Sequence, residues 1–240
     1  MVNWTKNINQ SVETYKKSSY EKYSSYERFR FVKDIIAKRI KGEEEFLDAG
    51  CAKGEFIWYL KDFFPRLRFT GFDISRELLS LAQKEQKLKD VRFVAADAQN
   101  FNLGRKFDVV CMSGVLSIFD DIQRPLNGIA RHLKPKGWGY IFGNFNREDI
   151  DVLVRYKNHY AGSKKWESGL NLYSLKSIKK ALRKFSGTIH VYPFKLSKDL
   201  VAEKDPVKSY TLNTLEKGRI VLNGANIVTD FYLVEFQKKT

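Results

Sequence analysis

Cysteine and histidine are scarce in this chain, and their scarcity excludes several kinds of functional site. The 240 residues include two cysteines and three histidines. Cys51 and Cys111 lie far apart and lack the spacing of metal ligands, so the sequence predicts neither a disulfide framework nor a zinc site. No serine lies in the glycine-flanked turn that presents the nucleophile of a serine hydrolase. We therefore expect no metal centre and no serine nucleophile.

Long apolar runs are missing as well. No apolar segment is long enough to cross a bilayer, and the first residues lack the charged start and apolar block of a secretion signal. The sequence therefore predicts a cytoplasmic protein with no membrane span.

Basic residues are in excess, with a formal net charge of +15 and a pI of about 9.6. Residues 147–240 contain 18 basic and 10 acidic residues, so this part supplies over half of the excess. Such a balance suits nucleic acid, an anionic surface or an acidic substrate, and it also suits a lysine-rich solubilising surface. Composition alone leaves these alternatives open.

Residues 46–56 are the most informative stretch. An apolar run ends at Asp48, and small residues (Gly50, Ala52 and Gly54) then open a predicted helix, so a ligand can approach the backbone closely. A dinucleotide loop needs a third glycine where this chain has Glu55, whose carboxylate would face a phosphate. We therefore expect a cofactor loop that does not bind NAD or FAD.

Three further predicted strands end in polar or small residues. Residues 69–73 end at Asp73, residues 91–96 are followed by Asp97, and residues 107–112 are followed by Ser113. Because parallel strands bind ligands at their carboxyl ends, these side chains and Asp48 are predicted to meet at one edge of a sheet.

The flanking segments indicate an elaborated single domain. Residues 1–41 are predicted to form a helical arm, and residues 42–240 a cofactor-binding domain with substrate-side insertions at about 147–173 and 195–226. A hairpin around residues 216–218 precedes the alternating run 228–236, so the last strand should pair antiparallel.

The motif Asp48-x-Gly-x-Ala-x-Gly54 and the acids that end the following strands resemble the class I S-adenosylmethionine (SAM) methyltransferases. The resemblance implies an α/β, Rossmann-like sheet of seven strands with the last antiparallel, here with an N-terminal helical arm and a C-terminal β-hairpin insertion. It implies that SAM binds and that S-adenosylhomocysteine (SAH) is the product. By resemblance, Asp73 would hold the ribose and Asp97 the adenine amino group. The cofactor-binding residues implied are Asp48, Ala49, Gly50, Cys51, Gly54, Asp73, Ile74, Asp97, Ala98, Ser113 and Gly114.

The catalytic residues are not identified by any motif. A sulfonium is already an activated leaving group, so methyl transfer needs alignment more than a base. His159, Tyr156 and Asp120 are the candidates if a base is used.

The acceptor is open between three interpretations. The first is a small molecule or glycan, methylated at a hydroxyl, with negative charge that the basic helix 174–185 and the aromatic residues Tyr156, Tyr160, Trp166 and Tyr210 would recognise. The second is RNA methylated at a ribose or ring position. Methylation of an exocyclic base nitrogen is disfavoured because Ser113-Gly-Val-Leu replaces the usual proline-rich turn. The third is a SAM-binding module without catalysis. Whether the chain is a monomer or a homodimer is left open.

Overall fold

The fold is described from a computed structural model of the 240-residue chain. The structure describes all residues except 1–14, 16–17, 22–25, 160–161, 163 and 203–208. Two of the predictions above, the role of Tyr160 and about half of the arm within residues 1–41, lie outside the described residues. No helix in the described part is long and apolar enough to span a bilayer.

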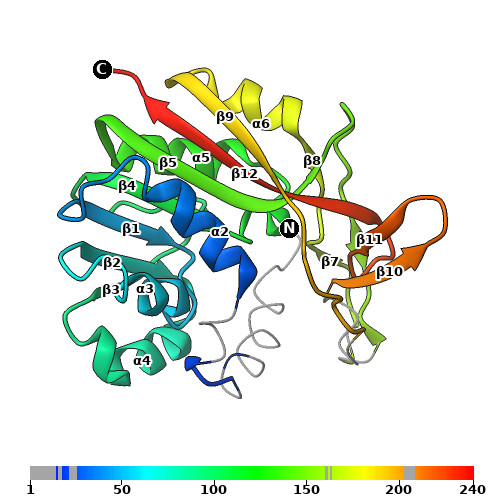
Figure 1. Cartoon of the computed structure of the whole chain (residues 1–240), viewed down its shortest axis with the longest axis horizontal. Coiled ribbons are helices and arrows are strands. Elements are labelled where there is room, and N and C mark those ends of the chain that lie inside the picture. The colour runs from blue at the N-terminus through cyan, green and yellow to red at the C-terminus, as the bar shows by residue number, and fades with distance from the viewer. Residues whose placement is uncertain (1–14, 16–17, 22–25, 160–161, 163, 203–208) are drawn as a thin grey trace.

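A single large sheet runs through the molecule (Figure 1). Its strand order is β10-β11-β12-β5-β4-β1-β2-β3, with β9 also paired to β12 and the short β8 paired to β5. Neighbouring strands from β3 to β5 are parallel, whereas β12 is antiparallel to both β5 and β9. The strands are β1 (Glu45–Ala49), β2 (Arg68–Asp73), β3 (Arg92–Ala95), β4 (Phe107–Ser113), β5 (Leu133–Asn146), β8 (Tyr173–Ser174), β9 (Ser186–Phe194), β10 (Tyr210–Thr214), β11 (Gly218–Leu222) and β12 (Val228–Lys238).

The predicted antiparallel last strand is therefore confirmed. Seven of these strands form the expected core, in the order β3-β2-β1-β4-β5-β12-β9. The sheet is larger than predicted for two reasons. The hairpin β10–β11 pairs with the first residues of β12, and β8 pairs with the last residues of β5.

Helices cover both faces of the sheet because its central strands are apolar on both sides. On one face Phe46 and Tyr140 pack with residues of α2, α3 and α4. On the other, Leu47 and Ile141 pack with residues of α5 and α6. The helices are α2 (Glu27–Ile36), α3 (Glu55–Leu60), α4 (Arg76–Lys84), α5 (Gln123–His132) and α6 (Leu175–Leu182), with single 3₁₀ turns η2 (Gln86–Leu88) and η3 (Leu116–Ile118).

Capping residues set where two of the helices begin. The hydroxyl of Ser75 accepts a hydrogen bond from the Leu78 amide at 3.3 Å, and that of Ser174 accepts one from the Ser177 amide at 3.1 Å. Within the predicted helical arm, residues 1–41, the helix α2 ends at Ile36. Residues 134–137 belong to β5, where Lys136 has a φ of +62°.

The two predicted insertions both contain β structure. Within residues 147–173, β6 (Arg155–Tyr156) and β7 (Glu167–Ser168) form a small antiparallel sheet. Within residues 195–226, β10 and β11 form the predicted hairpin, closed by a turn at 215–217. Both lie on the side toward which β1 and β2 point (Figure 1).

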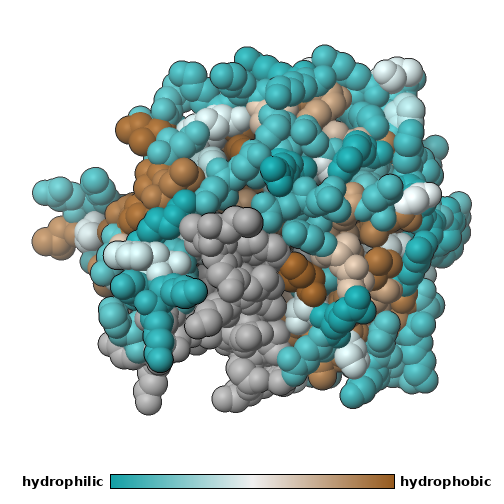
Figure 2. All heavy atoms as spheres, turned by 180° about the vertical axis from the view of Figure 1, so that it is seen from behind, coloured by the Kyte–Doolittle hydropathy of each residue, from teal (hydrophilic) through white to brown (hydrophobic). Residues whose placement is uncertain are grey.

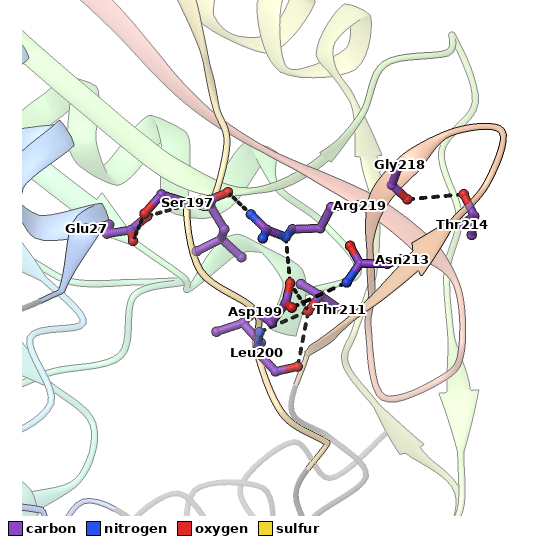
Figure 3. A network of polar contacts seen from close by, with 10 residues as sticks. Glu27, Ser197, Asp199, Leu200, Thr211, Asn213, Thr214, Gly218 and Arg219 are labelled. Atoms are coloured by element: carbon purple, nitrogen blue, oxygen red, sulfur yellow. Dashed lines mark hydrogen bonds and ion pairs between the residues drawn. The ribbon is translucent and has the colours of Figure 1, made fainter.

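Polar contacts fasten the segment after β9 to its neighbours (Figure 3). The Arg219 guanidinium donates to Asp199 at 2.6 Å and to the Leu196 carbonyl oxygen at 2.8 Å. The Ser197 amide donates to the Glu27 carboxylate at 2.7 Å. The segment therefore links the β10–β11 hairpin to α2, which lies near the other end of the sequence.

Candidate functional site

The loop after β1 has the backbone that its small residues allow. Gly50 has a φ of +78°, and a Cβ added there would lie 2.5 Å from the Val115 side chain, which follows β4. The amides of Gly50 and Cys51 donate to the Phe72 carbonyl oxygen in β2 at 2.8 and 2.9 Å. Ala52, at the place of a middle glycine, also has a positive φ of +49°. The loop is thus pressed against the carboxyl ends of β2 and β4, as a closely approached cofactor loop requires.

Asp73 lies directly beside this loop. One carboxylate oxygen accepts a hydrogen bond from the Ala52 amide at 2.9 Å, and the other accepts one from the Ser75 amide at 2.9 Å. Burial raises the pKa of Asp73 despite these hydrogen bonds. The half-buried carboxylate and the adjacent Ile74 therefore join the cofactor loop to the start of α4.

Three carboxylates gather where β1, β2 and α3 meet. Asp48 is 3% exposed and Glu55, the first residue of α3, is 4% exposed. Burial, followed by the charges of Glu55 and Asp73, raises the pKa of Asp48 to about 8. A cluster of buried acids suits a ligand with positive charge. SAM has two cationic groups, the sulfonium and the methionine ammonium, so these residues fit SAM better than a dinucleotide.

Glu55 is a member of this cluster that sequence reasoning used only to exclude a dinucleotide. The sequence shows that Glu55 follows Gly54, but the proximity of its carboxylate to Asp48 and Asp73 depends on how α3 packs. Cys51 lies in the same loop and is 4% exposed, and burial raises the pKa of its thiol well above the ordinary value. The thiol is therefore a packing group rather than a nucleophile.

The ends of β3 and β4 complete this edge of the sheet. The Asp97 carboxylate accepts a hydrogen bond from the Gln99 amide at 2.8 Å, and the next residue, Ala98, is buried. Ser113 is half-buried, and Gly114, with a φ of +70°, donates its amide to the Phe142 carbonyl oxygen. Ala49, the last residue of β1, is fully buried. All the predicted cofactor residues therefore lie at one edge of the sheet.

Described residues of the N-terminal arm contact the cofactor loop. The Tyr20 hydroxyl donates to the Lys53 carbonyl oxygen at 2.7 Å, and the Lys53 ammonium donates to the Ser18 carbonyl oxygen. Tyr15 packs against Ala52 and Leu78, and burial raises its pKa. The sequence showed these tyrosines as arm residues, but their partners in the loop are visible only in the structure.

Asp120 fastens the first insertion to the loop that follows β4. Its carboxylate accepts hydrogen bonds from Ser168 at 2.7 Å and from Asn171 at 3.2 Å, and it pairs with Arg155 at 2.7 Å. Burial acts to raise its pKa, but these hydrogen bonds and the Arg155 charge hold the pKa below the usual value. Among the three base candidates, Asp120 therefore has a structural role in the described contacts.

The other two candidates lie on the insertion. Tyr156 is half-buried in β6, opposite Glu167 of β7, and His159 is exposed in the segment after β6. Neither residue is part of the acid cluster. Within the described part of the chain, no three or more His, Cys, Asp or Glu residues are grouped so as to hold a metal ion.

Comparisons with known proteins show which family part of the chain matches. Residues 47–138 match a family model described as a methyltransferase domain. The chain is 23% identical over 181 residues to a malonyl-[acyl-carrier protein] O-methyltransferase of Bacillus cereus, covering 72% of this chain and 67% of the relative. It is 31% identical over 173 residues to an uncharacterized protein of Methanocaldococcus jannaschii, covering 71% of this chain and 60% of that protein.

Solved structures share the fold. A SAM-dependent methyltransferase of Clostridium acetobutylicum superposes with a TM-score of 0.56 at 15% identity, covering 97% of this chain and 99% of that one. A glycopeptide N-methyltransferase in complex with SAH superposes with a TM-score of 0.57 at 13% identity, covering 86% of this chain and 88% of that one.

The fold and the cofactor loop define an α/β protein of the methyltransferase type. Residues 47–138 are a methyltransferase domain by the family match, and the chain has the fold of class I SAM-dependent methyltransferases.

Proposed function

We propose that this chain transfers the methyl group of SAM to an oxygen of an anionic small molecule or glycan, bound between the end of β4 and the two insertions. The observation that carries this proposal is the anchoring of residues 147–173 at Asp120. Three side chains of the insertion converge on that carboxylate, which lies seven residues beyond the end of β4. A fixed wall at this place would shape a pocket for a small acceptor.

In this proposal the residues at the carboxyl ends of the strands hold the cofactor. Asp73 accepts hydrogen bonds from the ribose hydroxyls, and Asp97 and Ala98 contact the adenine. Asp48, Gly50 and Glu55 surround the cationic methionine end, with Ser113 and Gly114 nearby. When bound, SAM supplies a methyl group on a sulfonium that needs no further activation. The protein's task is then to align the acceptor oxygen and exclude water.

The negative charge of the acceptor is inferred from the relatives and from the insertion. Relatives include a malonyl-[acyl-carrier protein] O-methyltransferase and a trans-aconitate 2-methyltransferase, whose named acceptors contain carboxylates. In this chain the Lys157 ammonium lies 5.2 Å from the centre of the exposed Trp166 ring, so the insertion presents a cation beside an aromatic surface. A carboxylate acceptor needs no base, because its oxygen already has the lone pair that attacks the methyl carbon.

The test is an acceptor panel with SAM labelled in its methyl group. The panel contains dicarboxylates and tricarboxylates, nucleotide sugars, a glycopeptide and total RNA. We expect label in an anionic small molecule or glycan. Label in RNA alone would favour the RNA interpretation, and no label despite SAM binding would favour a module without catalysis.

Two variants test whether the acceptor binds at the first insertion. Lys157→Met should raise KM for the acceptor about tenfold, because one charge-assisted contact is lost, and should leave SAM affinity unchanged. Lys165→Met, an exposed lysine of the same segment, is the matched control and should have no effect. Equal KM in both variants would contradict the placement of the acceptor.

A further inference from the structure

Cationic side chains of two helices lie on the face of the sheet opposite α2, and only Lys176 among them pairs with a described residue of the first insertion, Asp149. α6 carries Lys176, Lys179 and Lys180, and α5 carries Arg124 and Arg131. Both helices pack behind the sheet, opposite α2 (Figure 1). Seen from that side, the surface is mostly hydrophilic (Figure 2). The start of α6 contacts the first insertion, whereas α5 contributes cations whose role the proposed acceptor site does not explain.

A groove of about 710 Å³ opens on this face along α5. Its cationic lining residues are Arg124, Arg131 and Lys238, and its walls include the amide side chain of Asn127 and the ring of Phe185. None of the described residues that line it is acidic. A second hollow of about 240 Å³ adjoins it, because Arg131 lines both, and contributes further cations, among them Lys106.

Positive charges from the groove and the adjoining hollow lie close enough to interact. Burial and then the charge of Lys106 lower the pKa of Lys238, whose ammonium donates to two carbonyl oxygens at the end of α5. The charges of Arg131 and Lys238 also contribute to lowering the pKa of His132, after the larger effect of burial. Binding of an anion would relieve this repulsion.

The arginines are available for such an anion. Arg131 is exposed and makes no hydrogen bond or ion pair with any residue that the structure describes. Arg124 approaches an acid only at 3.7 Å, from Asp121 one turn earlier, and both side chains are more than half exposed. Guanidinium groups bind phosphate through paired N–H donors, which suits them to a phosphate ester better than to a single carboxylate.

We propose that this groove binds a small phosphate-bearing ligand of the nucleotide class, with its phosphates at Arg124 and Arg131 and its ring against Phe185. The volume falls within the range of small-molecule sites, and the amide nitrogen of Asn127, whose oxygen accepts from Gln123 at 2.8 Å, offers a donor to a base or sugar. The site is distinct from the cofactor loop, although its lining begins at Gln99, two residues beyond Asp97. The proposal adds a second ligand to the enzyme and does not depend on the methyl acceptor.

The experiment is calorimetric titration of SAH-saturated protein with ADP, adenosine and pyrophosphate at low salt. SAH fills the cofactor site, so binding of ADP or adenosine at that site does not contribute to the measured heat. We expect ADP to bind, and adenosine to bind at least tenfold more weakly because it lacks phosphates. Absence of ADP binding would overturn the proposal, and pyrophosphate binding as tight as that of ADP would overturn the nucleotide assignment.

Charge-reversal variants locate the site. The double variant Arg124→Glu, Arg131→Glu should lose at least tenfold in ADP affinity, while SAH affinity and melting temperature stay unchanged. Lys89→Glu reverses an exposed lysine next to η2 and is the matched control. Equal ADP affinity in all three proteins would refute the location. An RNA oligomer whose affinity rises steeply with its length would show that the face binds nucleic acid instead.

Discussion

Asp48→Asn should make the cofactor-free protein more stable at alkaline pH. Burial and the charges of Glu55 and Asp73 raise the pKa of Asp48 from 3.8 to about 8. Because this pKa lies above that of the unfolded chain, the folded protein retains a proton that the unfolded chain releases. The contribution of Asp48 to stability is therefore fully present below pH 3.8 and is lost as the pH rises toward 8. Asparagine has nearly the same shape and no such proton.

The size of the effect follows from the linkage between protonation and folding. One proton retained in the folded state changes the free energy of unfolding by at most ~1.4 kcal/mol per pH unit. Between about pH 6 and about pH 8 the wild-type protein should lose about 2 kcal/mol relative to Asp48→Asn, because the slope levels off near the pKa. Glu55 and Asp73 are present in both proteins, so much of their titration cancels in the comparison.

Urea denaturation of both cofactor-free proteins across this pH range measures the difference. Glu148→Gln, which removes an exposed acid, is the control and should follow the wild type. A difference between wild type and Asp48→Asn that stays constant with pH would refute the reasoning. Above about pH 8, where Asp48 is ionised, SAM affinity should fall about tenfold in Asp48→Asn, since a charged acceptor for the methionine ammonium is lost.

Three further perturbations test other parts of the structure. Asp73→Ala removes the acceptor proposed for the ribose and should weaken SAM binding by roughly 1.5–3 kcal/mol in calorimetry; unchanged affinity in a folded variant would contradict that assignment. Gly50→Ala combines a φ of +78° with a clash at Val115. It should lower the melting temperature by more than Gly42→Ala, where φ is +95° and nothing lies within 4 Å of the added Cβ. Equal melting temperatures would show that the loop shifts to accommodate the side chain. Arg39→Met removes both guanidinium donors from the fully buried Glu235, which then keeps the Tyr192 hydroxyl but no positive partner there, and should cost roughly 3 kcal/mol in urea denaturation, with SAM affinity unchanged.

Much of the cofactor site could be predicted because its signals are local. An apolar run that ends in an acid marks the end of a buried strand, and small residues such as Gly50 mark a tight turn wherever they occur. Asp73 and Asp97 follow their strands directly in sequence, and parallel strands bring their carboxyl ends to one edge. The antiparallel last strand was predictable for the same reason, because a hairpin precedes it.

The sequence by itself determined the α/β fold, the cofactor loop and the acids that follow its strands, since each depends on spacing over a few residues. Only the tertiary structure decided what those residues do together. Glu55 joins Asp48 in a buried acid cluster, and Asp120 anchors an insertion that begins almost thirty residues later. Burial and charge coupling arise between groups brought together across the fold, so their strength depends on distances that sequence spacing does not contain. The same is true of the basic groove, where the arginines of α5 meet Lys238 from the last strand.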